Sequence, residues 1–200
     1  MIPPLLVLRH GETEWNAAGR LQGHSDSPLT PLGVAQARQQ KAILRGMGVD
    51  GWHWLSSPSG RARATADLAS EGFGIDIAED ARLMEIGMGR WTGASRAEIQ
   101  AECPQAFEQD DLSYYDAAPE GEGLTALALR CEDLLRDLNA PTILVTHGIT
   151  SRTLRCLALG IDPDRLAELP GGQGIVHHVE AKKMRVLTGV GGLPPLATLR

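Results

Sequence analysis

The chain has 200 residues, a length typical of one globular domain with a substantial hydrophobic core. Hydrophobic residues make up 42% of the sequence and charged residues 22%, a composition that excludes an intrinsically disordered chain. The formal net charge of −6 argues against non-specific nucleic-acid binding, which needs a basic surface, so any phosphate site must be a local cluster of cationic residues.

The first half of the chain predicts alternating strands and helices. Thr30 and Pro31 are typical of the N-cap and the first position of a helix. Apolar runs, capping residues and glycines then give the following predicted elements in order: a buried strand over 3–9, a helix from Pro31 that ends near Gly46 or Gly48, a strand over 52–56, a helix over 59–71, a short strand over 75–78 and an irregular loop over 82–93.

The second half continues the alternation and ends in antiparallel structure. Its predicted elements are one or two short helices over 95–111 broken at Pro104, a helix capped by Thr125, a strand over 141–146, a helix over 149–159 ended by Gly160, a hairpin of strands over 175–180 and 185–188, and an irregular tail from Gly189. Alternating strands and helices predict an α/β fold: a three-layer α/β/α sandwich with a mostly parallel sheet and an antiparallel hairpin at its edge.

Two predicted strands end in the same pair of residues. Arg9, His10 and Gly11 follow the first strand, and His147 and Gly148 follow the strand over 141–146. Sheets of this kind bind ligands just beyond the carboxyl ends of their strands. A single histidine in such a place is usually only a capped or solvated side chain, but two in matched positions favour one site with two imidazoles.

Three cysteines, Cys103, Cys131 and Cys156, are widely separated and lack the spacing of a metal site. Scattered cysteines in odd number predict reduced, mostly buried thiols. The apolar start over 3–8 is too short for a secretory signal, and no stretch is long enough to span a bilayer. We therefore expect a cytoplasmic protein without membrane contact.

Five blocks of sequence surround these features and follow one another along the chain: residues 8–16, 19–30, 57–62, 83–91 and 145–148. In this order they resemble the signature of the histidine phosphatase superfamily, which includes the cofactor-dependent phosphoglycerate mutases. The resemblance covers most of the chain. It implies the same α/β sandwich, a single domain over 1–200, a cap segment at about 94–123 over the site, and a mechanism without metal or cofactor.

The matching residue types suit phosphoryl transfer. His10 is the candidate nucleophile, because a neutral imidazole attacks phosphorus and the phosphohistidine formed is labile to water. Gly11 is expected to let the backbone pack closely behind His10, with its N–H free to orient the ring. Arg9 and Arg61 carry planar guanidinium groups that fit phosphate oxygens.

The other candidate ligands of the phosphate differ in how they would bind. His147, if protonated, would add a third cation, and Gly148 would open a helix whose free N–H groups attract anions. Asn16 would donate from a neutral amide. Arg61 alone is typical of a surface residue and Asn16 alone of a turn, but the resemblance assigns both to the phosphate pocket, with Gln22 and Gly23 as further substrate-binding residues.

Glu85 is the candidate proton donor. It precedes a glycine-rich loop that Trp91 closes, and a carboxyl group beside apolar and aromatic neighbours can have a raised pKa. Other acidic residues that compete for this role lie in first turns or loops: Glu12, Glu14, Asp26 and Asp80. The resemblance supports Glu85. The sequence contains no metal-ligand spacing.

Four positions depart from the family pattern. Ser59 replaces an aliphatic residue, Ala64 a glutamine, Thr92 a glutamate and Gly123 a serine. None of them is expected to touch the phosphate pocket. They bear instead on the contacts made by the rest of the substrate.

The leading hypothesis is a phosphomonoesterase that acts on small phosphorylated metabolites through phospho-His10. A phosphoglycerate mutase-type phosphoryl transfer is the first alternative, and a silent phospho-ligand binding module is the second. The silent module predicts loss of His10, Glu85 or His147, and all three are present. The cap segment carries Asp110, Asp111, Glu120 and Glu122, which disfavour a second anionic group on the substrate and hence a mutase. A homodimer is left open.

Overall fold

The computed structural model describes residues 2–108 and 112–189. Asp110, Asp111 and the predicted tail beyond Gly189 lie outside the described residues. The described chain forms one six-stranded sheet in the order β3-β2-β4-β1-β5-β6. The strands are β1 (Leu5–Arg9), β2 (His53–Ser56), β3 (Ala78–Glu79), β4 (Thr142–Thr146), β5 (Val176–Glu180) and β6 (Lys183–Leu187).

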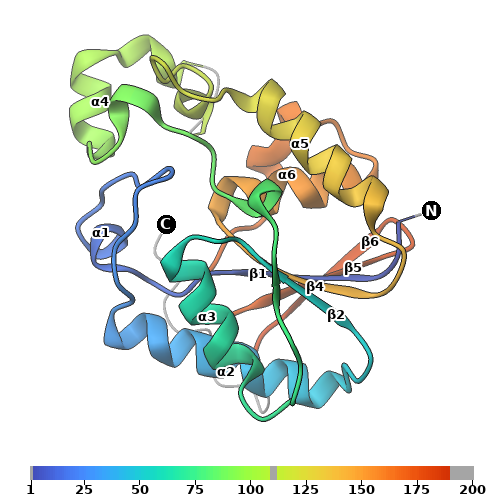
Figure 1. The fold of residues 1–200 in the computed structure, drawn as a ribbon. Helices are drawn as coiled ribbons and strands as arrows, with labels where there is room; N and C mark the ends of the chain where they lie inside the picture. The colour runs from blue at the N-terminus through green and yellow to red at the C-terminus, as the bar shows by residue number, and fades with distance from the viewer. Residues whose placement is uncertain (1, 109–111, 190–200) are drawn as a thin grey trace.

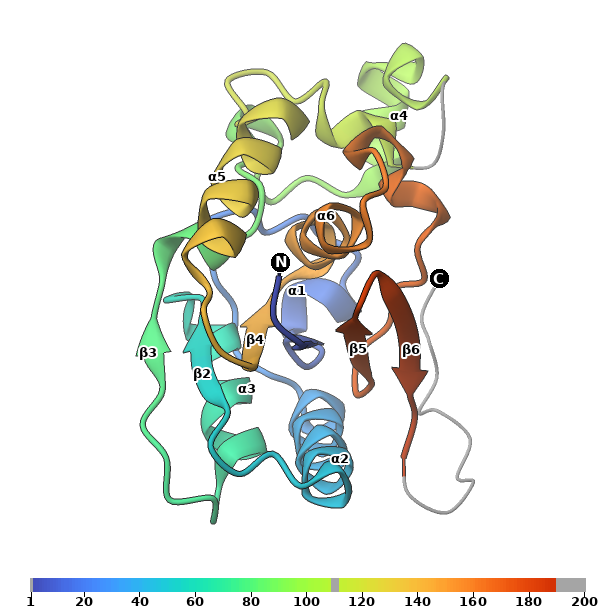
Figure 2. The same ribbon diagram turned by 90° about the vertical axis from the view of Figure 1, so that its right-hand side faces the viewer.

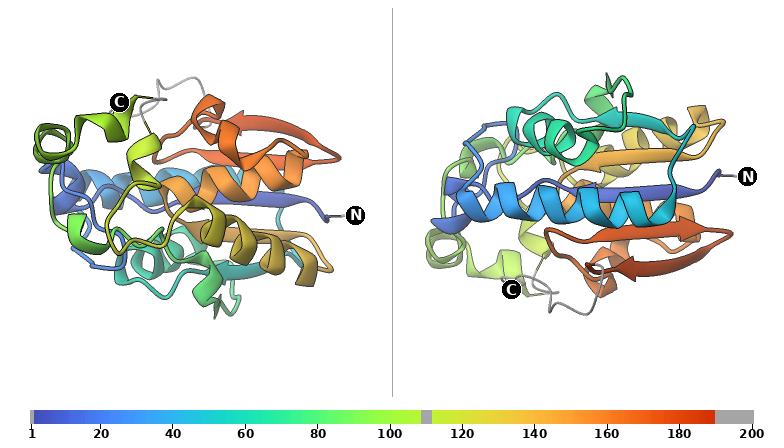
Figure 3. Two further views of the ribbon diagram at one scale, coloured as in Figure 1. Left: turned by 90° about the horizontal axis from the view of Figure 1, so that it is seen from above. Right: turned by 90° about the horizontal axis from the view of Figure 1, so that it is seen from below.

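The first four strands run parallel to one another, and the β5–β6 hairpin adds two antiparallel strands at one edge. Figure 2 shows the sheet between two layers of helices. The helices α2 (Pro31–Met47) and α3 (Gly60–Ser70) cover one face, and α5 (Leu124–Asp137) and α6 (Gly148–Leu159) cover the other (Figure 3). The predicted α/β/α sandwich with its edge hairpin is confirmed.

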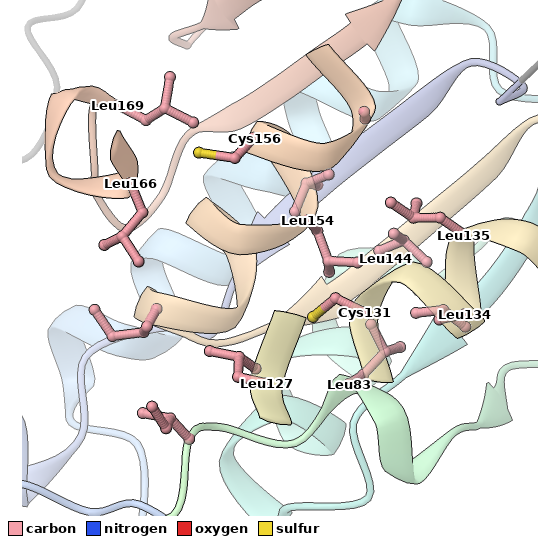
Figure 4. Packing of buried hydrophobic residues seen from close by; sticks show 14 of the residues in the cluster. Leu83, Leu127, Cys131, Leu134, Leu135, Leu144, Leu154, Cys156, Leu166 and Leu169 are labelled. Carbon is pink, nitrogen blue, oxygen red and sulfur yellow. The ribbon is translucent and has the colours of Figure 1, made fainter. Parts of the chain in front are cut away.

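The two faces of the sheet bury different residues of the same strand. Leu5 and Val7 of β1 belong to the core beneath α5 and α6, whereas Leu6 and Leu8 belong to the core against α2 and α3. This alternation follows from the two-residue period of a strand. Figure 4 shows the first core, in which Cys131 and Cys156 pack among leucines of α5 and α6. Both thiols are free and buried; Cys103 is free and partly buried.

Local capping signals placed α2 correctly. Thr30 Oγ1 accepts a hydrogen bond from the Gly33 N–H at 3.1 Å, and the helix ends at Gly48 in the left-handed conformation. The predicted start of α5 was wrong by two residues: Thr125 lies inside the helix, and Gly123 is the N-cap. Asp116, eight residues earlier, accepts from the Leu124 N–H at 2.7 Å and takes the capping role.

Short elements account for the other differences. The predicted strand over 75–78 is displaced to the two residues of β3, and the loop over 82–93 contains single turns of 3-10 helix. The sequence did not predict α1 (Glu14–Ala17), which Thr13 and Asn16 cap reciprocally. These elements are too short to display the repeating pattern of apolar residues from which longer helices and strands are predicted. The remaining ones are the 3-10 turns η1 (Ala81–Leu83), η2 (Gly89–Trp91), η3 (Pro104–Phe107), η4 (Ser113–Tyr115) and η5 (Pro163–Glu168), and helix α4 (Arg96–Glu102).

The centre of the sheet contains the topological switch point. β1 and β4 are neighbours with Arg9 opposite Thr146, but the chain leaves β1 toward α2 on one face and β4 toward α6 on the other. Such a divergence opens a crevice at the carboxyl ends of the strands. In Figure 1, α1 and α4 lie at this end of the sheet. Within the described residues, none of the helices combines the length and hydrophobicity needed to span a bilayer.

Candidate active site

His10 and His147 lie side by side at the crevice, as the matched His-Gly ends predicted. The His10 N–H continues the ladder of β1 and donates to the Thr146 carbonyl at 2.9 Å. The two ring centroids are 5.1 Å apart, edge to face, and both side chains are buried. The parallel register of β1 and β4 therefore brings together two residues that are 137 positions apart in the chain.

The His10 ring is held by a hydrogen bond at each nitrogen, which fixes where its proton lies. Its Nδ1 lies 2.7 Å from the Gly11 carbonyl oxygen, which can only accept, so Nδ1 carries the proton. Nε2 then has a lone pair and accepts from Arg61 Nε at 3.3 Å. Burial lowers the pKa of His10 well below its ordinary value, and neighbouring His147, Arg9 and Arg61 add to the effect. His10 is therefore a neutral imidazole with a nucleophilic Nε2.

Gly11 packs closely against Gly33, as expected, but it orients the His10 ring through a different backbone group from the one predicted. Its N–H donates to Thr65 Oγ1 at 3.0 Å, so its carbonyl, and not its N–H, holds His10. A Cβ on Gly11 would come within 2.3 Å of the Gly33 carbonyl oxygen. A side chain at this position would push the His10 loop away from the first turn of α2.

Arg61 is almost completely buried and is committed to several acceptors. Its Nη1 forms an ion pair with Asp26 at 2.9 Å and donates to the Ser25 carbonyl at 2.7 Å. Its Nη2 donates to the Gly23 carbonyl at 2.9 Å. The sequence treated Asp26 only as a competing acid, but the structure makes it the ion partner that fixes Arg61 beside His10. Gly23 also acts on Arg61 through its carbonyl.

Arg9 and Asn16 lie at the same cavity, and their side chains are engaged differently. The Arg9 Nε is buried and has no hydrogen-bond partner among the described residues. Asn16 Oδ1 accepts from the Thr13 N–H and from Gln173 Nε2, each at 3.3 Å, which turns the NH₂ group of Asn16 away from them. Gln173, which also donates to the His10 carbonyl at 3.0 Å, is a supporting residue that the sequence did not predict.

Glu85 occupies the N-terminus of α6. Its Oε2 accepts from the N–H groups of Gly148 at 2.8 Å and Ile149 at 3.2 Å. Its Oε1 accepts from the N–H groups of Thr150 and Ile86 and from the Thr150 hydroxyl. The N–H of Gly148 is thus not free for a phosphate, contrary to the prediction: the helix end holds the Glu85 carboxylate instead.

These contacts reverse the expected pKa shift of Glu85. Burial by itself raises the pKa, but the hydrogen bonds from Thr150, Ile86 and Ile149 and the charge of Arg61 outweigh it, so the pKa lies below its ordinary value. The prediction of a raised pKa is wrong for the substrate-free protein. The donors responsible come from α6, far along the chain, and the apolar sequence around Glu85 gave no sign of them.

His147 is neutral and not a third cation in this state. Burial lowers its pKa well below the ordinary value, and the charges of Arg61 and Arg9 lower it further. Its Nε2 lies 2.8 Å from Ser57 Oγ and 3.2 Å from Ser59 Oγ. Ser59 is one of the four departures from the family pattern. Neither Ser59 nor His147 is among the residues that line the catalytic cavity, so the expectation that the departures do not touch the phosphate pocket stays a prediction.

Of the four acidic residues that the sequence places in the cap segment, Glu120 and Glu122 are described by the structure. Glu122 pairs with Arg130 through both carboxylate oxygens and accepts from the Gly87 N–H at 3.1 Å. Its charge is therefore neutralised beneath the Glu85 loop. Glu120 is exposed. Neither of these two residues is among those that line the catalytic cavity.

A cavity of about 50 Å³ opens beside these residues. It is lined by Arg9, His10, Asn16, Arg20, Leu21, Gln22, Gly23, Arg61, Glu85, Met88 and Tyr115. At about 10–15 Å³ per water-sized group, this space holds roughly three to five such groups, similar to the four oxygens of a phosphate ester. Gln22 lines the cavity, but its amide is engaged by Thr13 and Ser27 at 2.9 and 3.1 Å.

No group of three or more His, Cys, Asp or Glu side chains within residues 2–108 and 112–189 is placed to hold a metal ion. The positive charge on the cavity wall comes from the guanidinium groups of Arg9, Arg20 and Arg61. The arrangement thus combines a neutral nucleophile, an Arg9 whose buried Nε has no partner among the described residues, a fixed Arg61 and the Glu85 carboxylate, which is the set of groups that phosphoryl transfer requires.

Known proteins share this sequence pattern and this fold. The model of the histidine phosphatase superfamily, branch 1, matches residues 5–187. A relative from Escherichia coli O1:K1, named probable phosphoglycerate mutase GpmB, is 37% identical over 161 residues, which cover 78% of this chain and 74% of the relative. A protein of the same name from Proteus mirabilis is 35% identical over 162 residues, with the same coverage.

Two solved structures are similar over nearly the whole chain. Bacillus stearothermophilus YhfR superposes with a TM-score of 0.78 at 31% identity, covering 93% of this chain and 96% of its own. A mycobacterial glucosyl-3-phosphoglycerate phosphatase in complex with VO3 superposes with a TM-score of 0.77 at 28% identity, covering 94% and 98%. With the family model matching residues 5–187 and these relatives spanning most of the chain, the protein belongs to branch 1 of the histidine phosphatase superfamily.

Proposed function

We propose that this protein is a metal-independent phosphomonoesterase that hydrolyses small phosphorylated metabolites through a phosphohistidine on His10. The observation that carries the proposal is the neutral, buried His10, which lines a cavity of phosphoryl size together with Arg9 and Arg61. A phosphatase among the similar structures supports it.

The first step forms a bond between His10 Nε2 and phosphorus and breaks the bond from phosphorus to the ester oxygen. Arg9, Arg61 and the amide of Asn16 bind the non-bridging oxygens and stabilise their charge. Glu85 gives a proton to the departing alkoxide. The hydrogen bonds to Glu85 hold its pKa low and favour the carboxylate. A phosphate dianion bound nearby favours the protonated carboxyl group instead, because a second negative charge raises its pKa.

The second step returns the protein to its starting state. Glu85, now a carboxylate, accepts a proton from water as the water oxygen attacks phosphorus, and the bond to His10 Nε2 breaks to release inorganic phosphate. Other residues act indirectly: Gly148 through Glu85, and Gly23 through Arg61. His147 is neutral before binding, and the phosphate dianion favours its protonated form in the complex.

Hydrolysis is proposed over mutase transfer. A mutase must keep water away from the phosphoenzyme and hold a second anionic group of its substrate. The cavity has about 50 Å³ of space, and Arg20 at its wall already donates to the Gly93 carbonyl at 2.7 Å. The names of the GpmB relatives make the mutase the alternative to test.

Brief reaction with a ³²P-labelled phosphomonoester followed by an alkaline quench tests the proposal. We expect acid-labile label on residue 10 that disappears in His10→Ala and persists in His53→Ala, a control at an exposed histidine in β2. Full label in His10→Ala would contradict the proposal. With 3-phosphoglycerate and 2,3-bisphosphoglycerate as primer, phosphate release should exceed formation of 2-phosphoglycerate; the reverse would make the protein a mutase.

The setting of this activity is part of the proposal. Three free cysteines fit a reducing compartment, and we place the protein in the cytoplasm. The chain 1–200 acts as one domain, with residues 94–123 as the cap over the substrate. A homodimer stays open, and sedimentation at several concentrations would decide it.

A further inference from the structure

Ser59 occupies the N-cap of α3 but does not cap the helix with its side chain. Serine is common at this position because its hydroxyl oxygen usually accepts a hydrogen bond from an N–H of the first turn. Here Asp26 takes that role, since its carboxylate accepts from the Arg61 N–H at 3.2 and 3.3 Å. A Cβ on Gly60 would come within 2.3 Å of this carboxylate, so the glycine leaves room for it. The Ser59 hydroxyl is therefore released from the helix and bonds elsewhere.

The Ser59 hydroxyl forms a triangle of polar atoms with Ser57 and His147. Ser57 Oγ lies 2.8 Å from His147 Nε2 and 2.9 Å from Ser59 Oγ, and Ser59 Oγ lies 3.2 Å from the same nitrogen. The Ser59 N–H also donates to Ser57 Oγ at 3.3 Å. Ser57 and His147 are completely buried, whereas Ser59 is half-buried. The two hydroxyl groups thus connect the buried imidazole to a side chain that reaches solvent.

In the substrate-free protein the hydrogen bonds run inward, from Ser59 to His147. The Ser57 hydroxyl donates to His147 Nε2 over the shortest of the three contacts, and the Ser59 hydroxyl donates to Ser57 Oγ. Each hydroxyl proton then has an acceptor. The single proton of the neutral imidazole lies on Nδ1, which is buried and has no hydrogen-bond partner among the described residues.

Protonation of His147 reverses this chain. The His147 ring lies 5.1 Å from the His10 ring, and a phosphoryl group on His10 favours the imidazolium through its negative charge. Nε2–H then donates to Ser57, Ser57 donates to Ser59, and the half-buried Ser59 donates to water. The proton balance closes: hydronium gives a proton to Ser59 Oγ, Ser59 passes its own proton to Ser57, and Ser57 passes its own to Nε2. Each oxygen keeps one proton, and His147 gains one.

The charged and titratable groups around His147 do not replace the serines. They are Arg9 and His10 at the end of β1, His24, Arg61 of α3, Arg130 of α5, and Glu85, which is bonded to the next residue in the chain through the Gly148 N–H. Within the described residues, none of them forms a hydrogen bond with a ring nitrogen of His147. Without the Ser59 hydroxyl the chain would end at Ser57, and protonation of Nε2 would leave the buried Ser57 proton without an acceptor.

We propose that Ser57 and Ser59 form a proton relay through which the buried His147 takes up a proton from solvent when a phosphoryl group binds. Ser59 is a positioning residue in this relay, because it acts on the reaction through Ser57 and His147. The inference rests on the proposed phosphatase activity. An aliphatic residue at position 59, as in the family pattern, would remove the outer hydroxyl, so this departure bears on the protonation of His147.

Ser59→Val and Ser59→Thr are matched variants, because their side chains have the same branched shape and differ in one hydroxyl group. Vanadate at saturating concentration is the probe that stands in for the phosphoryl group. Long-range ¹H–¹⁵N NMR then reports which ring nitrogens of His147 carry a proton as the pH is raised from neutral. Since a buried donor without an acceptor shifts an equilibrium by about fivefold or more, Ser59→Val should show a ratio of protonated to neutral His147 lower by about that factor than wild type and Ser59→Thr.

Equal ratios in Ser59→Val and Ser59→Thr would overturn the inference, and so would a neutral His147 in the wild-type complex. Because the Ser59 side chain does not cap α3, the two variants should unfold at the same temperature. A lower midpoint for Ser59→Val with an unchanged His147 would make Ser59 a structural residue and would also overturn the relay. Failure of wild-type protein to bind vanadate would instead overturn the proposed function on which the inference rests.

Discussion

Replacement of Glu85 by glutamine tests both the proton donor and the anchoring of α6. The carboxylate accepts hydrogen bonds from four backbone N–H groups, two at Oε1 and two at Oε2. The Thr150 hydroxyl lies 3.0 Å from Oε1 and 2.7 Å from the Met84 carbonyl oxygen, and its one proton is shared between them. An amide puts an NH₂ group where one of the oxygens stands. In either orientation at least two N–H or O–H donors lose their acceptor. Hydrogen bonds to a charged group contribute about 1.5–3 kcal/mol each, so the expected loss is about 3–6 kcal/mol of unfolding free energy.

Thermal unfolding of Glu85→Gln measures this loss directly. In a chain of this size about 1 kcal/mol lowers the midpoint by roughly 2–4 °C, so the lower figure corresponds to a fall of roughly 6–12 °C. Kinetics measured well below the new midpoint then report the chemistry. Loss of a general acid typically costs about 10²–10⁴-fold, and glycerol phosphate should show it. Nitrophenyl phosphate should be much less affected, because nitrophenolate leaves without a proton.

Thr150→Val is the matched control for Glu85→Gln. It removes the Thr150 hydroxyl, which lies 2.7 Å from the Met84 carbonyl oxygen and 3.0 Å from Glu85 Oε1, but keeps the carboxylate and every backbone donor. We expect a loss of about 1 kcal/mol and no dependence on the leaving group. Equal activity losses of Glu85→Gln on both esters would show that Glu85 does not donate the proton. An unchanged midpoint would refute the reasoning about the α6 N-terminus.

Three further predictions follow from the site. Because the pKa of His10 is lowered, the acid limb of kcat/KM, corrected for substrate ionisation, should lie below the ordinary histidine pKa of about 6.5; a limb at 6.5 would contradict a neutral nucleophile. Chelation with EDTA should leave turnover unchanged and vanadate should inhibit, whereas activity restored by a divalent ion would refute the metal-independent proposal. Burial lowers the pKa values of His10 and His147, and it lowers that of His177 to about 3. Below pH 6.5 the unfolded chain therefore binds more protons than the folded protein does. The free energy of unfolding should therefore fall between pH 7.5 and pH 5.5, by up to about 1.4 kcal/mol per pH unit for each histidine, and equal stability by urea titration at the two pH values would contradict it.

The sequence by itself determined the sheet, the main helices and the two histidines. An apolar run followed by His-Gly is a local pattern, and two such runs in parallel strands must end at the same edge. Thr30 and Pro31 likewise specify the start of α2 through contacts within one turn. These features depend on neighbours in the chain, and the neighbours are visible in the sequence.

The tertiary structure alone decided the charge state and the partners of the site. Arg61 is fixed by Asp26, 35 residues away, and Glu85 by donors of α6, more than 60 residues away. Ser59 reaches His147 across 88 residues, and Tyr115 of the cap segment lines the cavity. A pKa depends on burial and on charges nearby in space, and a capping carboxylate need not come from the helix it caps. Both are set by packing between distant segments, which the order of residues along the chain does not specify.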